Sequence, residues 1–197
     1  MNPRAWQGMK YPDSDVVGLV HRHARPGRDV PAGALALDVG CGPGRHVRLL
    51  SELGYRAVGL DSDPEMVAVA QGNGVEAVLA SAADYRPAEP PALALCWGFM
   101  MLVADGPALI AGWQPALVIA DWRSPRNDCF QWPGNEPQPG GGRRLHHPGH
   151  TLHGQVYFAH ELDQCELPGY ERVHHQIVTR ATPTDRHEWI QTVHRRR

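Results

Sequence analysis

The stretch ALALDVGCGPGRHVRLL, residues 34–50, places three glycines in five positions between an apolar run and a helix-like segment. Residues 34–40 predict a buried strand, and residues 44–54 predict a helix, because apolar side chains recur there at near-helical spacing. A helix that begins at a glycine turn presents unpaired backbone N–H groups and the positive end of its dipole. Glycine also lets a ligand approach the backbone closely. The turn is therefore expected to bind a polar ligand.

The spacing of these glycines tests whether the ligand is a dinucleotide of the NAD type. A dinucleotide site of the NAD type needs the pattern G-x-G-x-x-G. Gly40, Gly42 and Gly44 instead follow G-x-G-x-G, and position 45 is Arg. The pattern therefore disfavours NAD, and a turn with a purely structural role stays open as the alternative.

A carboxylate follows at the end of the next predicted strand. The segment AVGLDSDPEM, residues 57–66, puts Asp61 where a carboxylate can accept hydrogen bonds from both hydroxyls of a ribose. The alternative is that Asp61 caps the next helix. Ser62 or Asp63 is better placed as that cap, because Pro64 suits the first turn. This leaves Asp61 free for a ligand.

The rest of the chain alternates strands and helices before it changes character. Further strands are expected at residues 56–61, 75–81, within 91–102 and at 115–122, with a helix at 63–74. Strands separated by helices imply a parallel sheet with right-handed crossovers. Residues 123–150 are rich in Pro and Gly without a periodic run, which predicts a functional loop or lid, or disorder. Residues 170–181 and 187–196 predict an antiparallel hairpin at the sheet edge.

Length and composition fit one soluble domain. The 197 residues are 42% hydrophobic and 20% charged, with a formal net charge of -2. This balance gives no electrostatic footprint for nucleic acid, and no stretch approaches the roughly 20 apolar residues of a membrane span. The cysteines stand far apart without a C-x-x-C pair, which argues against a zinc site and a disulfide framework. We therefore expect a cytoplasmic protein with reduced thiols and no nucleic-acid or membrane partner, as a monomer or homodimer.

Together, these segments resemble a known family. LDVGCGPG (37–44) followed by GLDSDPEMV (59–67) is similar to motifs I and II of the class I S-adenosylmethionine-dependent methyltransferases. YPDSDVV, DWRSPRN and HEWIQTVHRR resemble a compact bacterial subgroup that acts on small molecules. The resemblance covers most of the chain. It implies a Rossmann-like α/β three-layer sandwich, with a seven-stranded sheet in the order 3-2-1-4-5-7-6, five parallel strands plus a C-terminal antiparallel hairpin. It also implies S-adenosylmethionine as cofactor and S-adenosylhomocysteine as product.

The resemblance assigns roles to individual residues. Gly40, Cys41 and Gly42 would line the methionine and ribose portion of the cofactor, and Asp38 would support the turn. Asp61 would hold the ribose diol, and Met66 would cover the adenine. The further cofactor-binding candidates are Tyr11, Gly44, Ser62, Ala82, Ala83, Asp84 and Trp97.

One departure from the family concerns adenine recognition. The family often has an Asp-Ala pair after the third strand, where this chain has Ala82 and Ala83. The nearby acid, Asp84, comes two positions late. The backbone N–H of Ala83 could serve the ring nitrogen, and Asp84 is either a ligand of the adenine amino group or a solvated loop acid.

Methyl transfer is an in-line displacement, so the site must align a nucleophile with the methyl carbon in a dry pocket. An alcohol or phenol acceptor also needs a base, and His suits this role because its pKa is near 6.5. The candidates are His147, in a loop cluster with three further histidines, and His160, which begins a helix-like stretch. The cluster lacks metal-ligand spacing, so no metal site is predicted, and solvated histidines are the alternative.

Acceptor binding is expected at the loops after the fourth and fifth strands, because ligands bind at the carboxyl ends of such strands. Trp97 is a candidate wall of the pocket. Trp122, Arg123 and Arg126 follow, and an Arg there could hold a carboxylate or phosphate of the acceptor. Core packing and structural ion pairs are the alternatives. Trp6 and Tyr11 belong to a segment that folds over the cofactor in similar enzymes.

These expectations divide a single domain into four parts: an N-terminal helical lid (1–33), a cofactor core (34–122), a variable acceptor loop (123–169) and a C-terminal hairpin (170–197). The leading hypothesis is a methyltransferase that acts on a small-molecule acceptor, with specialised metabolism as its setting. One alternative is a peptide or protein methyltransferase. The other is a domain that binds S-adenosylmethionine without transferring its methyl group.

Overall fold

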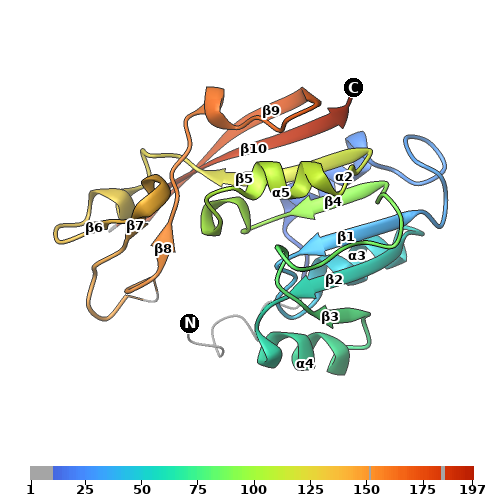
Figure 1. Cartoon of the computed structure of the whole chain (residues 1–197), viewed down its shortest axis with the longest axis horizontal. Helices are drawn as coiled ribbons and strands as arrows, with labels where there is room; N and C mark the ends of the chain where they lie inside the picture. The colour runs from blue at the N-terminus through green and yellow to red at the C-terminus, as the bar shows by residue number, and fades with distance from the viewer. Residues whose placement is uncertain (1–10, 151, 183–184) are drawn as a thin grey trace.

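The computed structural model describes residues 11–150, 152–182 and 185–197. Its main sheet has seven strands in the order β3-β2-β1-β4-β5-β10-β9 (Figure 1). The strands are β1 (Leu35–Val39), β2 (Arg56–Asp61), β3 (Ala77–Leu79), β4 (Leu93–Cys96), β5 (Leu117–Arg123), β9 (Tyr170–Ala181) and β10 (Arg186–Arg196). The first five are parallel, and β10 runs antiparallel between β5 and β9. The predicted fold, including the terminal hairpin, is confirmed.

Helices cover both faces of this sheet. Helices α2 (Ser14–His23), α3 (Arg45–Glu52) and α4 (Pro64–Gly72) pack on one face, and α5 (Gly106–Gly112) packs on the other. Successive residues of a strand point to opposite faces, so Ala36 of β1 faces α2 and α3 while Leu37 faces α5. Both faces are apolar, which explains why β1 is a continuous buried run and does not alternate with polar residues.

A separate small core fills the segment between β5 and β9. This insertion, residues 124–169, contains the short strands β6 (Glu136–Pro137), β7 (Arg143–Arg144) and β8 (Val156–Tyr157), which form a three-stranded sheet. It also holds the 3-10 turns η2 (Asp128–Gln131), η3 (Pro139–Gly141) and η4 (Leu162–Gln164). Its buried core is Cys129, Phe130, Leu145 and Tyr157. Strands of two residues leave no periodic pattern, so the sequence predicted only an irregular loop here.

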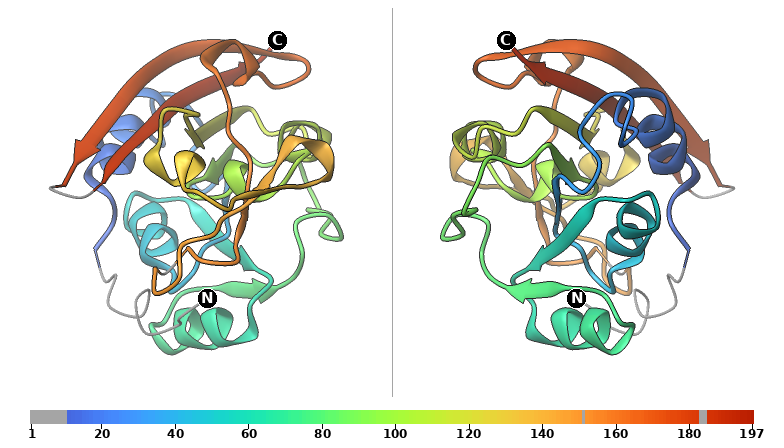
Figure 2. Two further views of the ribbon diagram at one scale, coloured as in Figure 1. Left: turned by 90° about the vertical axis from the view of Figure 1, so that its left-hand side faces the viewer. Right: turned by 90° about the vertical axis from the view of Figure 1, so that its right-hand side faces the viewer.

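The insertion lies at the carboxyl ends of the parallel strands. Figure 1 shows it on the side toward which β1, β4 and β5 point. The left view of Figure 2 looks at that end, and the insertion crosses in front of the strands. In a parallel α/β sheet this is the end where ligands bind.

The four cysteines are all buried and free. Burial raises the pKa of Cys41, Cys96, Cys129 and Cys165, so the thiols stay protonated at neutral pH. None of the helices in the described residues has the length and apolarity to cross a membrane.

The turn between β1 and α3 packs closely against α4. Gly44 is the N-cap residue of α3, and its φ of 83° lies in the left-handed region. Because Gly44 has no side chain, its backbone can lie close to Ala70 of α4. A Cβ atom at this position would overlap Val75 and lie 3.2 Å from the Ala70 Cβ. Gly44 therefore serves both the backbone turn and the contact between two segments.

We expect Gly44→Ala to lower the free energy of unfolding more than Gly74→Ala. Gly74 has a similar φ of 79°, but open space surrounds the position of its missing Cβ. The control variant should lose about 1 kcal/mol from the left-handed backbone alone, and Gly44→Ala a further ~1–3 kcal/mol from overpacking. Urea denaturation followed by circular dichroism measures both. Equal losses would show that the close contacts of Gly44 with Val75 and Ala70 contribute nothing.

Candidate functional site

A cavity of about 570 Å³ opens at the carboxyl ends of the parallel strands. One end is formed by the glycine turn, the end of β2 and the start of α4. The other is formed by the end of β5, the β9–β10 hairpin and β8 of the insertion. The two ends are joined by residues 97–103, which follow β4. The cavity therefore brings together segments from most of the chain.

Nine of the residues predicted from the sequence line this cavity: Gly40, Gly42, Asp61, Ser62, Met66, Ala82, Ala83, Trp97 and Arg123. Nine others do not: Tyr11, Asp38, Cys41, Gly44, Asp84, Trp122, Arg126, His147 and His160. Trp6 lies outside the described residues. The residues on the wall come mostly from the two motifs that decided the resemblance.

Asp61 joins the two motifs directly. Its Oδ2 accepts the backbone N–H of Gly42 at 2.8 Å, and its Oδ1 accepts the N–H of Asp63 at 3.0 Å. Asp63 itself caps α4 by accepting the N–H of Glu65 at 2.9 Å, which decides between the two predicted caps, Ser62 and Asp63. Each carboxylate oxygen can accept a second hydrogen bond, so Asp61 is held in place and still has capacity for hydroxyl donors from the cavity.

Asp38 lies beneath the turn rather than on the cavity wall. Its side chain is buried, and burial raises its pKa to about 7. Its Oδ2 has no hydrogen-bond partner among the described residues, and its Oδ1 is 4.0 Å from His46 Nδ1. Burial lowers the pKa of His46 to about 3, so this histidine is neutral, and its Nε2 accepts the N–H of Asp13 at 3.3 Å. His46 thus connects the turn to the start of α2, a role that no sequence pattern indicated.

Asp121 is a buried acid that does line the cavity. Its Oδ1 accepts the N–H of Gly98, which follows β4. Burial raises the pKa of Asp121 to about 6, against the opposing effects of the Gly98 hydrogen bond and the positive charge of Arg123. The carboxyl group therefore changes charge close to neutral pH.

Trp122 and the two candidate histidines lie away from the cavity. Because side chains alternate along β5, Asp121 and Arg123 face the cavity and Trp122 faces the core, where its indole N–H donates to Thr192 Oγ1 at 2.8 Å. His160 packs edge-on against Trp122, with ring centroids 5.0 Å apart, and burial lowers its pKa. His147 is exposed and packs on Trp132. No group of three or more potential metal ligands occurs among the described residues.

Tyr11 and Asp84, two of the predicted cofactor residues, are exposed. Tyr11 has 82% of its surface accessible, and its backbone carbonyl accepts a hydrogen bond from Arg45, which lines the cavity. Asp84 lies in the turn after β3. Cys41 is buried below the turn because its side chain fills the space above Gly59, a residue without a side chain of its own.

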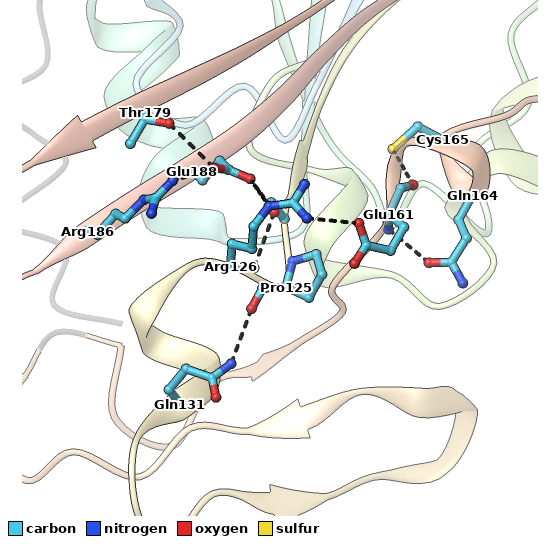
Figure 3. A network of polar contacts seen from close by, with 10 residues as sticks. Pro125, Arg126, Gln131, Glu161, Gln164, Cys165, Thr179, Arg186 and Glu188 are labelled. Atoms are coloured by element: carbon cyan, nitrogen blue, oxygen red, sulfur yellow. Dashed lines mark hydrogen bonds and ion pairs between the residues drawn. The ribbon is translucent and has the colours of Figure 1, made fainter.

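Arg126 belongs to an ion-pair network outside the cavity (Figure 3). Its Nε donates to Glu188 Oε1 at 2.8 Å, and its Nη1 lies 3.6 Å from Glu161 Oε2. Glu188 on β10 is buried and also accepts from Ser124 Oγ at 2.7 Å and Arg186 Nη2 at 3.0 Å. The network connects the insertion to the β9–β10 hairpin. Arg126 therefore forms a structural ion pair, the alternative to acceptor binding that the sequence left open.

The end of the cavity near Arg123 contains residues that the sequence did not single out. Tyr157 comes from β8, Trp189 and Gln191 from β10, and Arg180 from β9. Gln191 Nε2 donates to Asp15 Oδ2 at 2.9 Å, and Arg180 Nη2 lies 3.2 Å from the same oxygen. These bonds hold the start of α2 against the hairpin. The residues lie far apart in the chain, and so only the tertiary fold brings them together.

The sequence of the core matches known proteins. Residues 36–117 match the methyltransferase domain family. The trans-aconitate 2-methyltransferase of Mycobacterium sp. (strain KMS) is 33% identical over 118 residues, which cover 59% of this chain and 44% of the relative. The probable trans-aconitate 2-methyltransferase of Mycobacterium tuberculosis (strain H37Rv) is 31% identical over 105 residues, 52% of this chain and 38% of the relative. The chain spans less than half the length of these curated relatives.

Solved structures share the fold over nearly the whole chain. The Burkholderia thailandensis 1,6-didemethyltoxoflavin-N1-methyltransferase, determined with bound 1,6-didemethyltoxoflavin and S-adenosylhomocysteine, has a TM-score of 0.61 at 19% identity, and the match covers 98% of this chain and 77% of that chain. An S-adenosylmethionine-dependent methyltransferase from Mesorhizobium loti has a TM-score of 0.61 at 18% identity and covers 84% and 92%. The sequence match over residues 36–117 and the shared fold agree with the resemblance to the class I S-adenosylmethionine-dependent methyltransferases that the glycine turn and Asp61 indicated.

Proposed function

We propose that this protein binds S-adenosylmethionine in the cavity and transfers its methyl group to a small-molecule acceptor. The observation that carries the proposal is the meeting of the glycine turn and Asp61 at one wall, where the Asp61 carboxylate is fixed by Gly42 and still has acceptor capacity. This arrangement fits a ribose, whose two hydroxyls are both donors.

The rest of this wall fits the other parts of the cofactor. Met66 and residues 80–83 line the Asp61 end, where an apolar side chain suits an adenine ring, although the N–H of Ala83 already donates to Ser81 Oγ at 3.2 Å. Gly40 and Gly42 have φ values of 74° and 52°, which residues with a side chain rarely adopt. Because these two residues have no side chains, a ligand can approach their backbone closely. Trp97 lines the cavity next to Gly98, whose N–H donates to Asp121, so we assign it to the boundary between the methionine portion and the acceptor.

When bound, S-adenosylmethionine supplies an activated methyl carbon, and an acceptor lone pair displaces the sulfur, which keeps the electrons of the broken C–S bond. The protein's task is alignment and the exclusion of water. For an acceptor that carries a proton on its nucleophilic atom, the Asp121 carboxylate is placed to take that proton. His147 and His160 are screened from the cavity, so Asp121 replaces them in the proposal.

A small acceptor is supported by the shape of the site and by the relatives. The insertion, Trp189 and the start of α2 surround the Arg123 end of the cavity, which favours a molecule that enters it over a long polymer. The matched curated relatives are named for trans-aconitate, a small organic acid.

Asp61→Asn should weaken the binding of S-adenosylhomocysteine by about 10- to 100-fold, because a charge-assisted hydrogen bond contributes about 1.5–3 kcal/mol. Asparagine keeps the shape and one acceptor oxygen, so the fold should persist. Isothermal titration calorimetry measures the affinity. Asp84→Asn, at an exposed acid outside the cavity, is the matched control and should leave the affinity unchanged. An unaltered affinity in Asp61→Asn would refute the ribose assignment.

The preference for S-adenosylmethionine over S-adenosylhomocysteine should rise about 3- to 10-fold between pH 5 and pH 7. The raised pKa of Asp121, about 6, means that this group is neutral below pH 6 and a carboxylate above it. Only the carboxylate attracts the sulfonium charge, which the product lacks. Arg123 and Asp13 also act on this carboxyl group, the first favouring and the second opposing its charge.

Calorimetry with both ligands at each pH checks this expectation. A titrating group that affects both ligands equally changes both affinities by the same factor, so its effect cancels in the ratio of the two affinities. Asp121→Asn should give a ratio that is flat with pH. A flat ratio in the unaltered protein would remove Asp121 from the reacting end of the site.

A further inference from the structure

Arg123 in the cavity wall differs from its neighbouring arginines. Arg126 and Arg186 both pair with Glu188, at 2.8 and 3.0 Å, and Arg180 pairs with Asp15 at 3.2 Å. Among the described residues, no carboxylate oxygen lies within 4.0 Å of the Arg123 guanidinium. The side chain is half-buried and faces the cavity. A cation in such a position normally has an anionic partner.

Uncharged groups hold the Arg123 side chain in place. Its guanidinium carbon lies 5.0 Å from the ring centroid of Trp189 and 5.6 Å from that of Tyr157. Its Nε donates to Met101 Sδ at 3.5 Å. Trp189 is the cross-strand neighbour of Arg123, and the backbone carbonyl of Arg123 accepts the N–H of His160 at 2.8 Å. These contacts fix the position of the guanidinium without neutralising its charge.

The hydrogen-bonding groups that remain on Arg123 match one kind of ligand. Within the described part of the chain, no acceptor binds its two terminal amino groups. A guanidinium with a free edge forms two parallel hydrogen bonds with a planar oxyanion. A protonated amine would be repelled at this point, and a neutral apolar group would leave the cation without a partner.

The surrounding charges limit the charge of that oxyanion. Asp121 lies two residues away on the same face of β5, and Asp13 lines the same cavity. Arg180 lies 3.2 Å from Asp15 Oδ2 and 3.9 Å from Asp13 Oδ1, so its single positive charge is shared between two acids. A phosphate dianion would add two negative charges beside these acids, whereas a carboxylate adds one and is balanced by Arg123 alone. The wall therefore favours a carboxylate over a phosphate.

We propose that the methyl acceptor carries a carboxylate group and that Arg123 binds this group at the end of the cavity bounded by Tyr157 and Trp189. The proposal rests on the proposed function, because it takes the glycine-turn end to be the cofactor site. Tyr157 and Trp189 act as positioning residues for the guanidinium.

Binding to the protein saturated with S-adenosylhomocysteine tests the proposal without a known acceptor. The probes are acetate, benzoate and succinate, their amides acetamide, benzamide and succinamide, and phenyl phosphate. Saturation-transfer NMR observes each probe, and competition among them ranks the affinities. At least one carboxylate should bind about tenfold more tightly than both its amide and phenyl phosphate.

Variants then assign this binding to Arg123. Arg123→Gln should weaken the carboxylate by about tenfold or more, and Arg123→Lys, which keeps the charge but not the planar edge, by a smaller factor. Arg144→Gln changes an exposed arginine of β7 outside the cavity and should have no effect. The affinity of each variant for S-adenosylhomocysteine, measured by calorimetry, shows that the fold and the cofactor end are intact.

The outcomes separate the two proposals. If S-adenosylhomocysteine does not bind, the proposed function fails. If it binds but no carboxylate does, or if the amides bind equally well, the acceptor proposal is overturned while the cofactor site stands. Tighter binding of phenyl phosphate, or carboxylate binding that survives Arg123→Gln, also overturns it.

Discussion

The end of β2 fixes the glycine turn, and the whole site depends on this attachment. The carbonyl of Leu60 accepts the N–H groups of both Gly40 and Cys41, at 2.8 and 2.9 Å. The turn can lie this close because Gly59 has no side chain, since a Cβ there would be 2.6 Å from Cys41 Sγ. The following carboxylate, Asp61, then meets Gly42 without any further adjustment. A close backbone approach between two neighbouring strands thus sets the geometry of the predicted ribose site.

A buried acid, Asp38, lies beneath this turn. A carboxyl group whose pKa rises on folding, as that of Asp38 does to about 7, binds more protons in the folded state than in the unfolded state. Its contribution to stability therefore falls as the pH rises from about 4 to 7. His46 cannot compensate at neutral pH, because its own pKa is lowered and it stays neutral. The fold tolerates this cost at the place where a cationic ligand would approach, which is typical of functional sites.

The sequence predicted those features of the fold and the site that depend on residues close together in the chain. The glycine spacing, a cap at Ser62 or Asp63 and the strand order follow from local patterns and from the resemblance, and the structure agrees with them. The Arg123 end of the cavity could not be predicted in full, because it combines β5, β8 and β10 through register and packing. The insertion carried no usable signal, since its strands have two residues each and its core has four buried side chains.

Three successive residues of β5 show how the fold decides the roles that the sequence left open. Asp121, Trp122 and Arg123 are all plausible site residues as a string of letters. Alternation along the strand sends the middle one into the core, where Thr192 takes its indole N–H, and sends the outer two into the cavity. Asp121 then gains a backbone donor from Gly98, whereas the direct contacts of the Arg123 guanidinium with described residues are two aromatic rings and a thioether, beside its longer-range attraction to Asp121. The protein supplies a hydrogen-bond donor to the Asp121 carboxylate but no carboxylate that pairs with the Arg123 guanidinium among the described residues. The group missing from this end of the cavity is therefore an anion.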